Sequence, residues 1–127
     1  MKGSFETIIV DKEGDLAWVT LNRPEVANAF NTRMAEELLE VFSEFVSGAR
    51  KARCIILTGA GERAFCAGGD LKQRHGMTDE EWYQQHVVFE DLARALMDCP
   101  VPILGAINGA AFGGGTELTL ACDFAYA

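Results

Sequence analysis

Short apolar runs separated by polar turns predict a sheet. Residues 7–10 and 16–21 are apolar and β-branched, and the polar stretch 11–15 between them has the composition of a hairpin turn. Residues 54–58 and 103–107 are continuous apolar runs bounded by turn residues. Such runs are typical of strands covered on both faces in a parallel or layered sheet.

Two longer segments have the apolar spacing of one-sided helices. We expect Asn31 or Thr32 to cap the first and Gly48 to end it. Its apolar face comprises Met34, Leu38, Val41, Phe42, Phe45 and Val46. Residues 78–81 form a capping box that opens the second helix, and Pro100 stops it. We expect its inner stripe to comprise Trp82, Phe89, Leu92, Ala93 and Leu96.

The last quarter of the chain has the composition of a protein interior. Glycines 113–115 lead into a short helix at residues 116–121, and residues 123–127 begin a further strand. From Ala95 onward there are three acidic residues and no basic ones. The strand at residues 123–127 would leave a largely apolar sheet edge without a partner. Because complete proteins cover or charge the edges of their sheets, we expect further sequence or a partner chain to bury this edge.

Charge and length exclude several function classes. The 127 residues provide for one domain, and 19 acidic against 11 basic side chains give a net charge of −8. This charge argues against nucleic-acid binding. No apolar run approaches a membrane span and no secretion signal opens the chain, so we expect a cytoplasmic protein without membrane contact.

Cysteine and histidine spacing gives no metal site. The four cysteines form no C-x-x-C pair, which favours reduced thiols. His75 and His86 have no zinc-ligand spacing, so we expect no metal and place both at the surface.

Residues 59–64 have the form G-x-G-x-x-A, which is similar to a dinucleotide-binding fingerprint. That fingerprint requires a helix to begin within it, and residues 65–69 are too glycine-rich to continue one. We therefore expect no nicotinamide or flavin site.

Two glycine-rich junctions between a strand and a helix are candidates for chemistry, at residues 67–70 and 113–117. Glycine lets an N–H approach a ligand closely, and such groups can donate to an oxygen that gains negative charge. If the preceding strands are neighbours, the junctions could form an oxyanion hole. One cluster alone is more often a turn, and the helix dipole alone can favour Glu117. The paired clusters and the apolar flanks of Glu117 favour catalysis.

Residues 21–24, 65–72 and 106–118 resemble, in order and spacing, motifs of the crotonase or enoyl-CoA hydratase/isomerase superfamily. The resemblance covers essentially all of residues 1–127 but only the amino-terminal half, or slightly less, of a family member. It implies an α/β fold, a crotonase-like spiral of repeated β-β-α turns. It also implies that residues 1–127 are the amino-terminal part of an acyl-CoA-binding catalytic domain, in a homo-oligomer that is a trimer or hexamer.

The resemblance also implies roles for individual residues. The N–H groups of Gly69 and Gly114 would bind the thioester oxygen of an acyl-CoA substrate, and Glu117 would activate water. A second glutamate would follow about twenty residues further along, beyond residue 127. No tightly bound cofactor is implied, because coenzyme A enters as part of the substrate. The residues implied to face its nucleotide are Arg23, Val26, Ala27, Ala67, Gly68, Asp70 and Leu71.

The expected reaction is addition of water across the double bond of a 2-enoyl-CoA thioester, as in fatty acid metabolism. Similar proteins use the same oxyanion hole for double-bond isomerisation and other reactions, so these alternatives stay open. An inactive truncated half, or a fragment that binds acyl-CoA without chemistry, is a further alternative.

Overall fold

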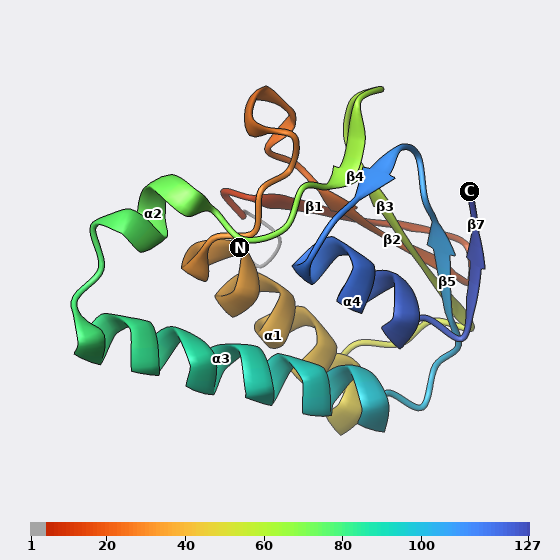
Figure 1. Cartoon of the computed structure of the whole chain (residues 1–127). Helices are drawn as coiled ribbons and strands as arrows, with labels where there is room; N and C mark the ends of the chain where they lie inside the picture. The colour runs from red at the N-terminus through yellow and green to blue at the C-terminus, as the bar shows by residue number, and fades with distance from the viewer. Residues whose placement is uncertain (1–4) are drawn as a thin grey trace.

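The computed structural model describes residues 5–127, which form three successive β-β-α turns and a final strand (Figure 1). The first turn contains β1 (Ile8–Glu13), β2 (Leu16–Leu21), the 3-10 helix η1 (Pro24–Val26) and α1 (Thr32–Ser47). The second contains β3 (Cys54–Gly59), β4 (Ala64–Cys66), α2 (Leu71–His75) and α3 (Asp79–Asp98). The third contains β5 (Ile103–Ala106), β6 (Ala110–Ala111) and α4 (Gly114–Ala121), followed by β7 (Phe124–Tyr126).

The strands form two sheets. The larger has the order β1-β2-β3-β5-β7, and the smaller pairs β4 with β6. Only β1 and β2 are antiparallel; the other pairs are parallel. Because β3 and β5 are neighbours and their continuations β4 and β6 also pair, the loops after β4 and β6 reach the same edge of the small sheet.

The predicted hairpin is confirmed, with Ile8 opposite Leu21 and Glu13 opposite Leu16. β1 extends three residues further than expected, into the polar stretch. The turn itself is therefore short, and Gly14 adopts a φ of +59°, which glycine tolerates better than other residues.

The first predicted helix is also confirmed, and Asn31 rather than Thr32 caps it. The Asn31 side chain accepts a hydrogen bond of 2.8 Å from the N–H of Met34, and Gly48 ends α1 in the left-handed conformation. The expected apolar residues are buried except Val46, which is 42% exposed.

The capping box of α3 is confirmed, but its inner stripe is partly wrong. Leu92 and Leu96 are buried, whereas Trp82 is 49% exposed and Ala93 is exposed. Successive helix residues lie about 100° apart, so Ala93 cannot share the face of Leu92. That face packs on α1 and also buries Gln85 and Ala95 (Figure 1).

The predicted strands at residues 54–58 and 103–107 are confirmed as β3 and β5, paired in parallel, but within the described chain one face of each is only partly covered. β3 and β5 alternate between buried and partly exposed positions. Figure 1 shows α1, α3 and α4 gathered on one side of the larger sheet, which explains why one face is better covered.

Between residues 5 and 127, no helix combines the length and apolarity needed to cross a bilayer. All four cysteines are free thiols. His75 is exposed as expected, but His86 is only partly exposed because its ring packs 3.9 Å from that of Trp82, centroid to centroid.

Candidate active site

The two glycine-rich junctions lie in contact. The N–H of Phe112 donates to the carbonyl of Cys66 at 3.1 Å, which ties the end of β6 to the end of β4. A Cβ at Gly68 would lie 2.8 Å from the carbonyl oxygen of Phe112 and 3.7 Å from the Cα of Gly113. Both glycines have positive φ, at +95° and +49°. Close approach and backbone conformation therefore both require glycine here.

Gly69 and Gly114 each have an N–H without an acceptor. Gly69 forms a parallel bridge with Phe30 in which the carbonyl of Gly68 and the N–H of Asp70 make the hydrogen bonds. In such a bridge the N–H of the middle residue points away from the partner. Gly114 is the first residue of α4, where helix N–H groups lack intrahelical partners. Within residues 5–127 neither N–H donates a hydrogen bond.

Main-chain bonds also join the two segments expected to face the CoA nucleotide. The N–H of Ala67 donates to the carbonyl of Ala27 at 3.0 Å, and the N–H of Phe30 donates to that of Gly68 at 2.6 Å. Val26 is 40% exposed and Leu71 is 77% exposed beside this junction. Their contact with CoA stays a prediction.

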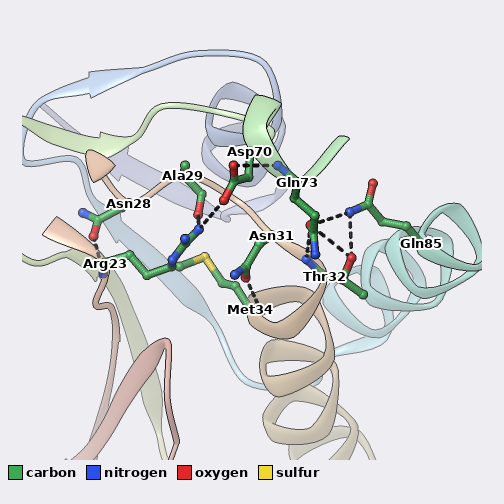
Figure 2. A network of polar contacts seen from close by, with 9 residues as sticks. All are labelled: Arg23, Asn28, Ala29, Asn31, Thr32, Met34, Asp70, Gln73 and Gln85. Atoms are coloured by element: carbon green, nitrogen blue, oxygen red, sulfur yellow. Dashed lines mark hydrogen bonds and ion pairs between the residues drawn. The ribbon is translucent and has the colours of Figure 1, made fainter. Parts of the chain in front are cut away.

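Arg23 and Asp70 bind each other at this junction (Figure 2). The Nη1 of Arg23 lies 3.1 Å from Oδ2 of Asp70 and also donates to the carbonyl of Ala29 at 2.7 Å. Asp70 caps α2 by accepting from the N–H of Gln73 at 3.2 Å. Burial opposes ionisation of Asp70, but the Gln73 hydrogen bond and the Arg23 guanidinium outweigh it and lower the pKa of this carboxyl.

A partly buried network of amide side chains next to this junction was missed from the sequence. Oε1 of Gln73 accepts from Nε2 of Gln85 and from the N–H of Thr32, which joins α2, α3 and α1 (Figure 2). Gln85 is 1% exposed. The only signal for it is a polar residue at helical spacing from Leu92 and Leu96 on the buried face of α3.

Glu117 lies in the first turn of α4 and is exposed. The expectation that its apolar flanks would make an ionised carboxylate costly is therefore wrong in the described chain. The helix directs these flanks to different sides, since Leu118 is 6% exposed and Leu120 is 79% exposed.

The segment that resembles a dinucleotide fingerprint forms no helix. After Gly59 the chain turns and enters β4. A cavity of about 150 Å³ lies beside this turn and reaches Ala27. Its lining residues are Pro24, Ala27, Ala60, Gly61, Glu62, Arg63 and Ala64.

Two cysteines are poor nucleophiles: Cys66, which lies against Gly115, and Cys122, which caps the far end of α4. Burial raises the pKa of the Cys66 thiol, and burial followed by the charge of Asp123 raises that of Cys122 to about 11. Both therefore stay protonated at neutral pH. Residues 5–127 contain no cluster of three His, Cys, Asp or Glu side chains suited to a metal ion.

Known proteins are similar to this chain in sequence and fold. The family model described as enoyl-CoA hydratase/isomerase matches residues 11–127. The chain is 36% identical over 119 residues to a short-chain-enoyl-CoA hydratase from Clostridium acetobutylicum, covering 94% of this chain and 45% of that protein. It thus spans less than half the length of this curated relative.

Solved structures agree. An enoyl-CoA hydratase from Bacillus anthracis matches with a TM-score of 0.87 and 41% identity, covering 94% of this chain and 46% of that one. An enoyl-CoA hydratase/isomerase from Mycobacterium paratuberculosis matches with a TM-score of 0.86 and 30% identity, covering 96% and 49%. The predicted crotonase-like fold, as an amino-terminal half, is confirmed. The chain belongs to the enoyl-CoA hydratase/isomerase family.

Proposed function

We propose that this chain is the amino-terminal part of an enzyme that adds water across the double bond of a 2-enoyl-CoA thioester. The N–H groups of Gly69 and Gly114 donate to the thioester oxygen, and Glu117 activates the water. The observation that carries the proposal is the contact between the two glycine junctions, each with an N–H that donates to no acceptor within residues 5–127.

The chemistry of hydration fits these parts. Addition of water places negative charge on the thioester oxygen as the enolate forms, so fixed donors stabilise the transition state more than the substrate. One such donor typically contributes about 2.7–4 kcal/mol. A positioned carboxylate contributes roughly 10²–10⁴-fold as a general base. The second glutamate that the resemblance implies lies beyond residue 127.

Coenzyme A enters as part of the thioester substrate, and the proposal includes no tightly bound cofactor. Arg23 and Asp70 hold together the two segments that face its nucleotide, and the residues in direct reach are Val26, Ala27, Ala67, Gly68 and Leu71. We further expect a cytoplasmic homo-oligomer, a trimer or hexamer.

The test uses the complete reading frame that contains these residues and follows the absorbance of a conjugated enoyl thioester. We expect Glu117→Gln to lower kcat by roughly 10²–10⁴-fold. Glu90→Gln on α3 is the matched control, since it neutralises an exposed acid outside the site. Normal turnover by Glu117→Gln would contradict the assignment of this residue as the base.

We also propose that the 127 residues by themselves bind acyl-CoA but do not turn it over. Its support is that the matched relatives are about twice as long. The isolated chain should then bind a CoA ester saturably, and Glu117→Gln should not change the affinity. Turnover by the isolated chain at the rate of a complete relative would overturn this view.

A further inference from the structure

Arg74 lies directly over one of the two glycines of the site. It is exposed, yet its guanidinium reaches back across Gly69. A Cβ at Gly69 would lie 2.6 Å from Cζ, 2.7 Å from Nη2 and 3.0 Å from Nη1 of Arg74. The charged end of this side chain therefore rests on the residue whose N–H is proposed to bind the thioester oxygen.

The charge of Arg74 has no carboxylate partner within residues 5–127. Asp70, four residues earlier, has its side chain bound to Arg23 and to the N–H of Gln73. The other ion pairs of the described chain involve Arg33, Arg50 and Arg94. The site therefore holds a positive charge that no carboxylate of residues 5–127 pairs with.

The surroundings of Arg74 strengthen this charge. α2 also contains Lys72 and no acid, although the whole chain has a net charge of −8. Positive charge concentrated at one place in an acidic protein attracts anionic ligands to that place and raises their association rate.

We propose that Arg74 binds a negatively charged group of the substrate beside Gly69, at the site that the N–H groups of Gly69 and Gly114 form. The group is either a phosphate of CoA or a carboxylate at the far end of the acyl chain, since a guanidinium pairs with both through two parallel hydrogen bonds. The inference rests on the proposed function, because an acyl thioester bound at Gly69 is what brings the anion within reach of Arg74.

The experiment measures binding, so it does not depend on turnover. The complete protein is titrated calorimetrically with three saturated thioesters: butanoyl-CoA, butanoyl-pantetheine, which lacks the nucleotide phosphates, and glutaryl-CoA, which adds a terminal carboxylate. The variants are Arg74→Ala, Arg74→Lys and the control Arg94→Ala, which removes an equal charge from an exposed position on α3. Circular dichroism verifies that each variant is folded.

We expect Arg74→Ala to weaken binding of the anion-bearing ligand by roughly 10–100-fold, the usual contribution of a charge-assisted hydrogen bond. Lysine should restore part of this loss. Weakening for both CoA esters but not for the pantetheine ester identifies a phosphate, whereas weakening for glutaryl-CoA alone identifies a carboxylate.

An equal effect on all three ligands, no effect on any, or the same effect from Arg94→Ala would overturn the proposal, as would failure of the wild-type protein to bind any of the three thioesters. If the predicted binding pattern is found but no enoyl thioester is hydrated by the wild-type protein, the proposed reaction fails while the role of Arg74 stands.

Discussion

The guanidinium of Arg23 lies 3.1 Å from the carboxylate of Asp70, which joins the loop after β2 to the start of α2 across 47 positions of sequence. The same guanidinium donates to the carbonyl of Ala29, next to the Phe30–Gly69 bridge. Both side chains are mostly buried, at 18% and 15% exposure. The pair therefore fixes the position of Gly69 from two sides.

Arg23→Ala should lower both stability and activity. The variant loses the ion pair and the hydrogen bond to Ala29, which together contribute about 1–3 kcal/mol to the free energy of unfolding. Because a displaced donor loses much of its effect, kcat should also fall by roughly 10–100-fold. Arg50→Ala, which breaks the ion pair with Glu44 at the other end of α1, is the control and should reduce stability only. Unchanged kcat in Arg23→Ala would contradict the link to Gly69.

Asp70→Asn should remove a pH-dependent part of the stability. The folded-state pKa of Asp70 lies below its value in the unfolded chain, so its contribution is fully present above the unfolded pKa of about 3.9 and is lost as pH falls through the folded pKa. Asparagine can still accept from the N–H of Gln73, so the variant loses mainly the charge. Urea unfolding from pH 6 to pH 3 should show the gap between wild type and variant closing below about pH 4. A gap that stays constant with pH would contradict this.

Gly114 and Gly115 are neighbours with opposite tolerance for a side chain. A Cβ at Gly115 would collide with the carbonyl oxygen of Cys66 and lie 2.9 Å from its Cβ, whereas nothing lies within 4 Å of a Cβ at Gly114. Gly115→Ala should therefore destabilise the protein by about 1–3 kcal/mol or more, because neither obstacle can move freely. Gly114→Ala should leave the free energy of unfolding and kcat close to wild type, as measured by urea unfolding and turnover.

Gly114→Pro tests the N–H itself. Proline is well accepted at the first position of a helix, so the fold should survive, but the donor is gone. We expect kcat to fall by roughly 10²–10³-fold relative to Gly114→Ala. If the folded proline variant turns over as fast as the alanine variant, the N–H of Gly114 is not a donor to the oxyanion.

The elements predicted well are those with local signals. Asn31 and Gly48 delimit α1 through caps that depend on adjacent residues, and the Thr78–Glu81 capping box does the same for α3. By contrast, β4 and β6 are three and two residues long, too short for any periodicity. The two strands form because they pair with each other, and a local sequence pattern cannot show pairing between distant segments.

The sequence allowed us to predict which segments form the site, but not how exposed or buried their individual side chains are. Parallel neighbouring strands brought the two glycine junctions together, as expected from their shared position after a strand. The exposure of Glu117 and of Trp82 depends instead on which face of each helix packs against other parts of the fold. The same holds for Gln85, whose burial comes from the packing of α3 on α1.

Glu37 holds residues 6 and 7, just before β1, to α1, and Glu37→Gln should weaken this attachment. This carboxylate is 3% exposed and accepts hydrogen bonds from the N–H groups of Glu6 and Thr7, at 2.9 and 2.8 Å. An amide offers one acceptor in place of two, so one N–H would face a donor and lose its bond. We expect a loss of about 1.5–3 kcal/mol in the free energy of unfolding and faster hydrogen exchange in β1. Glu40→Gln, an exposed change on the same helix, should alter stability by less than about 0.5 kcal/mol. Equal losses in the two variants would show that Glu37 does not anchor β1.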